Sequence, residues 1–411
     1  MNVDVHIDWH GEARFVGRLY PAGRGSAVTF EYAREWLITE GSFSIDPTAL
    51  PLRQGSHHAS SLFGAFHDCG PDRWGRLLIE RAVRKQALSQ KPYRDLDYTL
   101  ALDDHSRIGA LRFTEAGGGP YLAAGVANIP PVIQMGALLR AVDAVHSDTE
   151  TAADLRYLLG HGSPLGGARP KSAVVLADGS LAIAKFPKSD DIRDICAGEV
   201  LALRLAEKAG LTVAPSELTY VGERSVSVIN RFDRVANHRV PFLSASSLLG
   251  TKQGEAGTYT MIADAIRSFG DDVKRDLREL WRRMVYALLI SSYDDHLRNH
   301  GFLMRNAGRW ALSPAYDLNP VPEIDRTQAP ETSISEELAE PSIDEALRVC
   351  ARFGLKTAEA KGVLRDVFEA VISWNDVGRS LGLRGRTLES YASAFENPLM
   401  DETRKLLKLQ R

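Results

Sequence analysis

The stretch Ser291-Ser-Tyr-Asp-Asp-His-Leu-Arg-Asn-His300 decides the fold prediction, together with Ser313-Pro-Ala-Tyr-Asp317 further along the chain. Asp294 and Asn299 in the first stretch are five residues apart. Kinases use this spacing to place a proton-accepting carboxylate beside a metal-binding amide. Asp317 lies 18 residues beyond Asn299, at the expected end of a short hairpin, and offers a second carboxylate to a metal. The two stretches together predict an ATP-dependent phosphoryl-transfer site.

The residue types in this region fit that chemistry. Asp294 can orient an acceptor hydroxyl and take its proton, so we predict that it is the catalytic base. Asn299 and Asp317 offer the oxygen ligands that Mg²⁺ prefers. His296 is predicted to support the loop beside the bound nucleotide. Asp295 is adjacent to Asp294, and only the spacing to His296 and Asn299 favours Asp294 as the base.

An amphipathic helix is predicted to lead the chain into this loop. Its apolar residues recur at i, i+3 and i+4 over three turns: Leu277, Leu280, Trp281, Met284, Val285, Leu288 and Leu289. Each polar residue of the loop, taken singly, is also typical of an ordinary turn or helix end without a catalytic role. Spacing, order and the preceding buried helix together favour catalysis. His300 is predicted to be a structural histidine.

A glycine-rich turn forms a second candidate site, His161-Gly-Ser-Pro-Leu-Gly-Gly-Ala-Arg-Pro-Lys171. Adjacent glycines let backbone N–H groups curl around an anionic oxygen. A plain hairpin turn explains the glycines equally well. As a phosphate-binding loop, the turn supplies candidate ATP contacts at Gly166, Gly167, Ala168, Arg169 and Lys171.

Lys185 ends an apolar run 14 residues after Lys171. A lysine on the strand after a glycine-rich turn can reach the phosphates of ATP. A solvated lysine on a strand edge is the alternative, but the apolar neighbours argue against full exposure. Glu199, 14 residues further on and near the start of a predicted helix, could hold Lys185 by an ion pair, and this pairing is left open.

The segment Asn230-Arg-Phe-Asp-Arg234 follows an apolar strand. It is typical either of a hinge that presents backbone groups to adenine or of a strand that ends in a charged turn. The hinge interpretation makes Asn230 and Phe232 candidate nucleotide contacts.

The chain has 411 residues, of which 44% are apolar and 25% charged, so we expect a globular protein with two or three cores. The net charge of −3 gives no global basic field, and DNA contacts would be local or come through a partner. Three cysteines without paired spacing favour a reducing compartment. We find no secretory signal and no apolar run of membrane-spanning length, so we expect a cytoplasmic protein without membrane contact.

Alternating apolar and polar residues over 3–45 predict a small antiparallel sheet, and a Gly/Pro-rich segment that ends near Pro131 predicts a domain boundary. Further helices are predicted over 58–90, 132–160, 199–209, from Ser342 through Phe353, 358–373 and 386–396; strands are predicted over 108–113, 172–176, 181–185 and, as a pair, 216–231. The predicted divisions are 1–115, 132–245 and a helical part over 246–411.

In combination and order, these motifs resemble the HipA family of bacterial serine/threonine kinases, the toxins of HipBA toxin–antitoxin modules. The resemblance covers nearly the whole chain. Residues 30–37 (Phe-Glu-Tyr-Ala-Arg-Glu-Trp-Leu), 70–74 (Gly-Pro-Asp-Arg-Trp) and 108–111 (Ile-Gly-Ala-Leu) are similar to the family's N-terminal subdomain. The other matches are the phosphate loop from Ser163 to Lys171, the ATP lysine Lys185, the hinge at Asn230, and Asp294, Asn299 and Asp317.

The resemblance implies an α+β, two-lobed protein-kinase-like fold related to phosphatidylinositol 3/4-kinases. Residues 1–115 would be an extra N-terminal α/β subdomain, 132–245 the N-lobe and 246–411 the mainly helical C-lobe. It also implies ATP and Mg²⁺ as cofactors and autophosphorylation at Ser163, whose phosphate would repel ATP and switch the kinase off. The implied substrate is a translation protein such as an aminoacyl-tRNA synthetase. The implied partner is a HipB-like helix-turn-helix antitoxin, through which the complex would bind DNA.

Two alternatives stay open. The same loop chemistry would serve a small-molecule or lipid kinase, although no polybasic run or basic amphipathic helix supports a lipid substrate. The chain could also be a kinase-like co-repressor that only binds its partner. The intact set of Lys185, Asp294, Asn299 and Asp317 argues against a catalytically dead protein.

Overall fold

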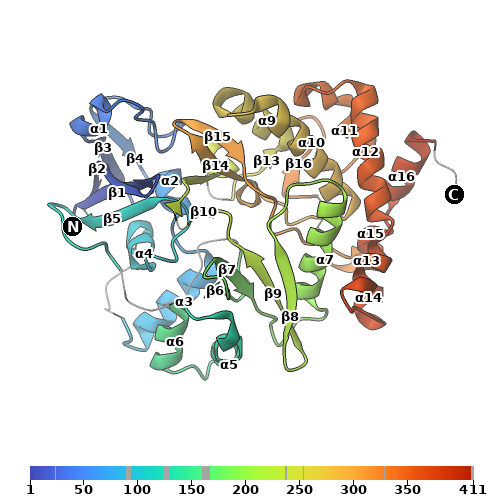
Figure 1. Cartoon of the computed structure of the whole chain (residues 1–411), viewed down its shortest axis with the longest axis horizontal. Helices are drawn as coiled ribbons and strands as arrows, with labels where there is room; N and C mark the ends of the chain where they lie inside the picture. The colour runs from blue at the N-terminus through green and yellow to red at the C-terminus, as the bar shows by residue number, and fades with distance from the viewer. Residues whose placement is uncertain are drawn as a thin grey trace. The chain divides into compact units, whose positions relative to one another are not determined.

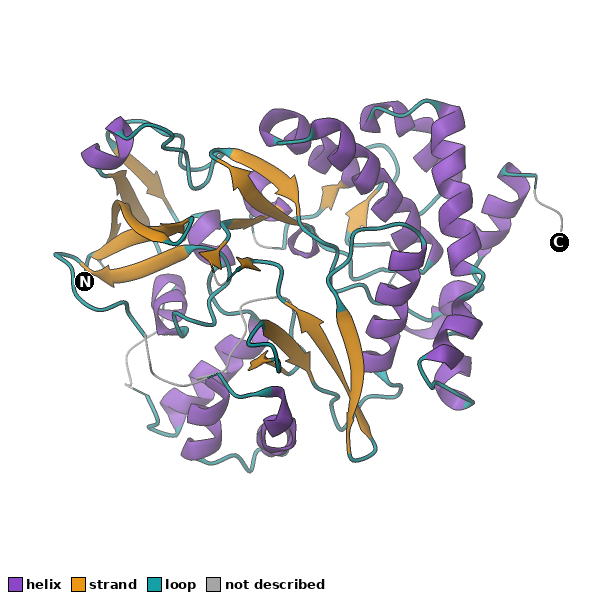
Figure 2. Cartoon of the chain, in the orientation of Figure 1, coloured by secondary structure: helices purple, strands orange, loops and turns teal. Residues whose placement is uncertain are grey.

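The computed structural model describes residues 1–23, 25–88, 94–123, 129–159, 167–236, 238–252, 254–327 and 329–408. These residues form two compact units, each built from several segments of the chain. Unit 1 comprises Met1–Asp190, Thr219–Gly250 and Phe302–Arg309, and unit 2 comprises Asp191–Leu218, Thr251–Gly301 and Trp310–Arg411. Figure 1 labels the helices and strands, and Figure 2 shows that helices dominate unit 2.

A five-stranded antiparallel sheet opens unit 1, in the order β4-β3-β2-β1-β5. Its strands are β1 (Val3–Trp9), β2 (Glu12–Pro21), β3 (Val28–Tyr32), β4 (Ser56–Ala59) and β5 (Leu111–Glu115). Every second residue of β1 faces the core, and Val3, Val5 and Ile7 are at most 1% exposed. The predicted antiparallel sheet is confirmed. The helix predicted from residue 58 is wrong at its start, because His58 lies in strand β4 and pairs with Thr29 of β3.

The second core of unit 1 surrounds a sheet in the order β6-β7-β9-β8. Its strands are β6 (Lys171–Val175), β7 (Leu181–Lys185), β8 (Ser216–Val221) and β9 (Arg224–Asn230). Three helices contribute to the same core: α3 (Arg73–Arg84), α5 (Met135–His146) and α6 (Ala152–Leu159). Core residues include Leu78, Val142, Leu155, Val174 and Val228. The strands predicted between 172 and 231 and the helical region over 132–160 are confirmed.

The shorter elements of unit 1 lie between the strands of these sheets or follow β9 along the chain. They are α1 (Arg34–Ile38), α2 (Gly64–Asp68), α4 (Asp95–Ala101), η1 (Val132–Gln134), β10 (Arg234–Val235), β11 (His238–Arg239), β12 (Phe242–Ser244) and α8 (Ala245–Leu249).

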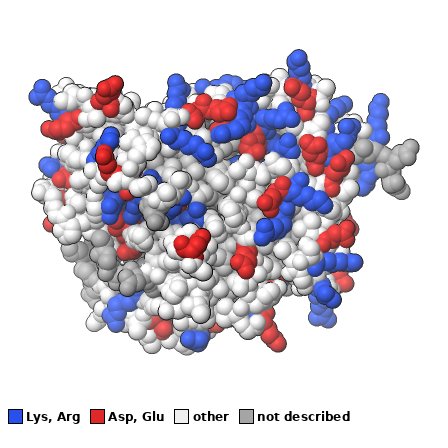
Figure 3. Space-filling view, viewed as in Figure 1, with Lys and Arg blue, Asp and Glu red and all other residues white. Residues whose placement is uncertain are grey.

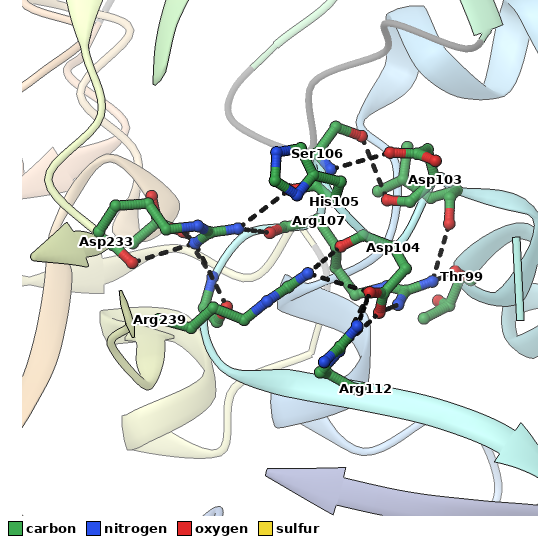
Figure 4. A network of polar contacts seen from close by, with 12 residues as sticks. Thr99, Asp103, Asp104, His105, Ser106, Arg107, Arg112, Asp233 and Arg239 are labelled. Carbon is green, nitrogen blue, oxygen red and sulfur yellow. Dashed lines mark hydrogen bonds and ion pairs between the residues drawn. The ribbon is translucent and has the colours of Figure 1, made fainter. Parts of the chain in front are cut away.

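A buried polar network joins residues 103–112 to residues 231–239 within unit 1 (Figure 4). Asp104 pairs with Arg107 at 3.1 Å, with Arg112 at 2.6 Å and with Arg239 at 3.1 Å. Arg107 is fully buried, so its charge requires the carboxylate of Asp104 as an acceptor. The network fixes the segment that follows β9 onto the loop that precedes β5.

Asp233 forms the other end of this network. It pairs with Arg231 at 2.6 Å and with Arg234 at 2.5 Å, and Gly109 N donates to its Oδ2 at 2.7 Å. Burial alone would raise the pKa of Asp233, but the two guanidinium groups hold it well below its usual range. Arg231 and Asp233, which follow the end of β9, are therefore paired and buried, and the hinge interpretation of this segment stays a prediction.

We predict that Asp233→Asn lowers the free energy of unfolding by about 3–5 kcal/mol at pH 7, because it leaves buried guanidinium groups unpaired. Since folding depresses the pKa of Asp233, its contribution exists above the unfolded pKa and is lost as the pH falls through the folded one. The difference between variant and wild type should therefore shrink below about pH 4. Denaturant unfolding at several pH values measures it.

The matched control is Asp143→Asn, which weakens the partly exposed pair of Asp143 with Arg224 at 2.7 Å and should cost at most about 1 kcal/mol. Equal losses in the two variants would contradict the importance of the buried network.

Unit 2 is mainly helical. Its elements are α7 (Ile195–Lys208), β13 (Gly257–Thr258), α9 (Tyr259–Phe269), α10 (Val273–Leu289), η2 (Leu297–Asn299), η3 (Glu323–Asp325), β16 (Thr332–Ser333), α11 (Ile343–Arg348), η4 (Cys350–Phe353), α12 (Thr357–Val371), α13 (Trp374–Ser380), α14 (Arg386–Glu389), α15 (Ala392–Phe395) and α16 (Pro398–Leu406). The central helix α10 packs against α9 and α12 (Figure 1). The buried helix predicted from residue 277 is confirmed.

Several helix boundaries differ from the prediction. Asp194 caps α7 by accepting from Ala197 N at 2.9 Å, so this helix starts four residues before Glu199. Ser342 does cap α11, but the helix ends at Arg348 and a 3-10 turn follows. The helix predicted over 386–396 is divided into α14 and α15, and α13 was not predicted.

On the face shown in Figure 3, acidic and basic side chains are interspersed. Across the ranges that the structure describes, no helix has both the length and the apolar character needed to cross a membrane.

Candidate active site

The loop after α10 lies within unit 2 and brings two predicted residues together. Ser291 turns the chain with a φ of +54°, directly after the helix. Asn299, the last residue of η2, donates from Nδ2 to the main-chain oxygen of Asp294 at 2.9 Å. This hydrogen bond closes the loop, so the predicted base and the predicted metal ligand face one small region.

The segment that carries Asp317 is held by α10. The buried Arg283 donates to Ser313 O at 2.6 Å, and Asp276 accepts from Leu312 N at 2.9 Å. Between the loop and Asp317 the chain forms β14 (Gly301–Asn306) and β15 (Arg309–Leu312). Ser313 N then donates to Gly301 O at 2.9 Å. The chain therefore returns to the end of the loop, as the predicted hairpin requires.

Burial and neighbouring charges change the pKa of the Asp294 carboxyl. Its side chain reaches solvent, yet the surrounding protein partly desolvates the carboxyl and thereby raises its pKa. His296 opposes this shift, whereas the negative charges of Asp317 and Glu331 add to it. A carboxylate with a raised pKa accepts a proton more readily, which suits a general base.

Asn299 and Asp317 fit a hard cation. Asn299 Oδ1 is buried and has no hydrogen-bond partner among the described residues. A buried oxygen in that state is costly unless a ligand satisfies it. Asn319 Nδ2 donates to Asp317 Oδ1 at 3.2 Å and orients the carboxylate. The described part of the chain holds no cluster of three or more His, Cys, Asp or Glu side chains for a metal, so Mg²⁺ would depend on these two residues and on nucleotide oxygens.

The other residues that were predicted to bind the nucleotide belong to unit 1. Glu199, which was predicted to pair with Lys185, belongs to unit 2. Ser163 and Gly166 lie outside the described residues. Gly167 has a φ of +64°, which favours glycine, and Ala168 beside it is exposed. Arg169 is half-buried.

Lys171 is anchored rather than solvated. Its Nζ pairs with Asp72 Oδ2 at 2.7 Å, and both side chains are buried. Trp74, two residues after Asp72, donates to Lys171 O at 3.1 Å. The start of α3 therefore holds the strand that follows the glycine-rich segment. Asp72 was not among the predicted site residues, because no local pattern connects positions 99 residues apart.

Lys185 lies opposite Lys171 in the pairing of β7 with β6, and it is 9% exposed. The solvated alternative for Lys185 is therefore wrong. Asn230 pairs with Ala182 at the end of β9, and the Phe232 ring lies 6.3 Å from that of Phe242. Glu199 is buried on α7 in unit 2, at 2% exposed. The roles of these residues in nucleotide binding stay predictions.

A family model described as the HipA-like C-terminal domain matches residues 163–374, and a model of the HipA N-terminal domain matches residues 7–114. The chain belongs to the HipA family.

Known relatives extend this result. "Putative kinase Y4mE" of Sinorhizobium fredii (strain NBRC 101917 / NGR234) is 26% identical over 343 residues, which cover 76% of each chain. A "Putative kinase" of Haemophilus influenzae (strain ATCC 51907 / DSM 11121 / KW20 / Rd) is 28% identical over 156 residues, 34% of this chain and 46% of the relative. The family and these names indicate a kinase-type protein.

The fold also matches a solved structure. A chain of the Shewanella oneidensis MR-1 toxin–antitoxin complex of HipA, HipB and operator DNA superposes with a TM-score of 0.73 over 100% of both chains, at 16% identity. The chain described in this article therefore has the mixed α and β fold of that structure.

We predict that Asp317→Asn weakens Mn²⁺ binding about tenfold or more in the presence of a non-hydrolysable ATP analogue, because it removes a charged ligand. The variant should stay folded, since Asn tolerates the left-handed φ of +56° at this position. Mn²⁺ titration by electron paramagnetic resonance measures the affinity, with the exposed Asp401→Asn as control. Wild-type affinity in the Asp317 variant would rule out this ligand.

Proposed function

We propose that this chain is an ATP-dependent kinase that phosphorylates serine or threonine hydroxyl groups of a protein. One observation carries the proposal: Asn299 closes the loop on Asp294 and keeps its own Oδ1 without a partner among the described residues, while Asp317 raises the pKa of Asp294. These observations support a site at which the base and the metal ligands would meet. Membership of the HipA family and relatives named as kinases support the same class of reaction.

In this proposal Asp294 orients the acceptor hydroxyl and takes its proton while the hydroxyl oxygen bonds to the γ-phosphorus of ATP, the bond from that phosphorus to ADP breaks, and ADP leaves. Mg·ATP, when bound, supplies the γ-phosphoryl group and neutralises the charge of its oxygens. Asn299 and Asp317 would hold the metal, and His296 would limit the movement of the loop.

The nucleotide is proposed to contact residues of the sheet in unit 1. Lys185 would contact the phosphates and pair with Glu199. The glycine-rich turn would cover the phosphates with Gly166, Gly167, Ala168, Arg169 and Lys171, while Asn230 and Phe232 would border adenine. This arrangement corresponds to the two-lobed kinase fold related to phosphatidylinositol 3/4-kinases, with residues 1–115 as an added subdomain.

The biological role is proposed from the family. The protein would act in the cytoplasm as the toxin of a HipBA-type module and phosphorylate a translation protein, such as an aminoacyl-tRNA synthetase. Its partner would be a HipB-like antitoxin that contacts DNA, as in the complex with HipB and operator DNA from Shewanella oneidensis. Autophosphorylation at Ser163 would limit its activity.

We predict that the purified protein gains one phosphoryl group on incubation with Mg·ATP. Asp294→Asn should slow this gain about 10²–10⁴-fold, because it removes the general base. Intact-mass spectrometry follows the reaction, peptide mapping tests Ser163 as its position, and the exposed Asp401→Asn should react at the wild-type rate. If neither the protein itself nor any protein of a bacterial extract gains phosphate, the kinase proposal is wrong.

Induced expression in a bacterium is expected to stop growth. Asp294→Ala should abolish this effect while the protein accumulates in folded form, because growth arrest depends on phosphoryl transfer. Growth curves and thermal melting of the purified variant provide the two measurements. Persistent arrest by a folded Asp294→Ala protein would separate toxicity from catalysis.

A further inference from the structure

A trio of buried side chains meets at the loop that carries Asp294: Tyr259 comes from α9, and Asp295 and His300 come from the loop itself. The Tyr259 hydroxyl donates to Asp295 Oδ2, and His300 Nε2 lies 3.3 Å from Asp295 Oδ1, within ion-pair distance but without an aligned hydrogen bond. The rings of Tyr259 and His300 meet edge-on, with centroids 5.2 Å apart. All three residues are at most 5% exposed. We propose that this trio positions Asp294 for catalysis and that Asp295 is an anchor, not the base.

This inference rests on the proposed kinase function and goes beyond it, since it assigns the neighbouring carboxylates opposite roles. Asp295 is buried, and each of its oxygens already faces a partner. Asp294 reaches solvent and can meet a substrate hydroxyl. The two neighbouring carboxylates therefore differ in exposure and in their partners, as one anchor and one base require.

Tyr259 is a rigid anchor because of its place in the fold. Thr258 caps α9 by accepting from Met261 N at 3.1 Å, so Tyr259 is the first residue of the helix. The two residues of β13 also pair with β16. Thr260 in the same turn donates to Glu336 at 3.0 Å. The hydroxyl that contacts Asp295 is therefore attached to main chain that is fixed on several sides.

A close approach of backbone to the loop accompanies this hydrogen bond. A Cβ atom on Gly257 would lie 2.7 Å from the methyl carbons of Leu297, a distance that real side chains do not tolerate. Glycine at this position lets β13 lie directly against η2. Residues 257–259 thus contact the loop on both sides of His296. Tyr259 donates a hydrogen bond to Asp295, and Gly257 lies against Leu297.

The main chain around Asp294 is fixed as a result. Glu331 N donates to Tyr293 O at 3.0 Å before it, and the trio holds Asp295 after it. An apolar cavity, lined in part by Met284, Leu288 and Ile334, borders Tyr259 and Asp295. Hydrogen bonds are stronger in such apolar surroundings than in water. The carboxyl of Asp294 is then pre-positioned, and a small displacement would be expensive for catalysis.

The test compares Tyr259→Phe with Tyr286→Phe. Tyr286 is also fully buried and donates one hydrogen bond, to Ala202 O at 2.5 Å. Each variant loses one buried hydroxyl, but only the first is linked to the loop. Tyr259→Phe should lower kcat about 10–100-fold, leave the KM for ATP within about twofold of wild type, and speed amide hydrogen exchange over 293–299 about tenfold or more. Tyr286→Phe should change neither rate by more than about twofold.

Equal effects of the two variants on kcat and on exchange would reduce the trio to ordinary structural support and overturn the inference. Amide exchange needs no catalysis, so it decides the question even if the wild-type protein transfers no phosphate and the proposed function fails. Asp295→Asn completes the test, because it keeps an acceptor for Tyr259. It should retain at least about a tenth of the wild-type kcat, and a loss as deep as that of Asp294→Asn would make Asp295 the base.

Discussion

The hydrogen bond from the Asn299 side chain to the main-chain oxygen of Asp294 is the interaction on which the candidate active site depends. It uses the amide nitrogen to close the loop and leaves the amide oxygen buried without a donor among the described residues. An aspartate at this position would have no donor for the loop. One asparagine thereby fixes the loop and leaves free an oxygen atom of the type that a hard cation binds.

The sequence predicted the elements whose pattern is local. The apolar positions of α10 recur with helical period, and most strands of the two larger sheets in unit 1 alternate or are continuously apolar, so their type followed from the residues. The exception is β4, where His58 was predicted to begin a helix. The loop after α10 was also predictable, since its two functional residues are only five positions apart and one hydrogen bond joins them. Helix ends were less predictable, because a cap such as Asp194 outweighs the apolar pattern.

Pairs that are distant in the sequence could not be predicted. Lys171 and Asp72, or Tyr259 and Asp295, meet only after the chain has folded, and nothing in their local patterns connects them. Arg231 and Asp233 were compatible with a charged turn at the end of a strand, but the sequence did not show that tertiary structure buries both. A charged or hydroxyl side chain has the same local signal whether it faces water or a buried partner, so its role depends on long-range packing.

The buried network of unit 1 has a consequence for how such proteins can evolve. The regions that match the N-terminal and C-terminal family models are joined by the ion pair of Asp104 with Arg239 and by the hydrogen bond from Gly109 N to Asp233. A lineage that exchanged or deleted the N-terminal region would leave several guanidinium groups without acceptors in a nonpolar interior. The two regions are therefore bound to descend as a pair, unless compensating substitutions replace the arginines first.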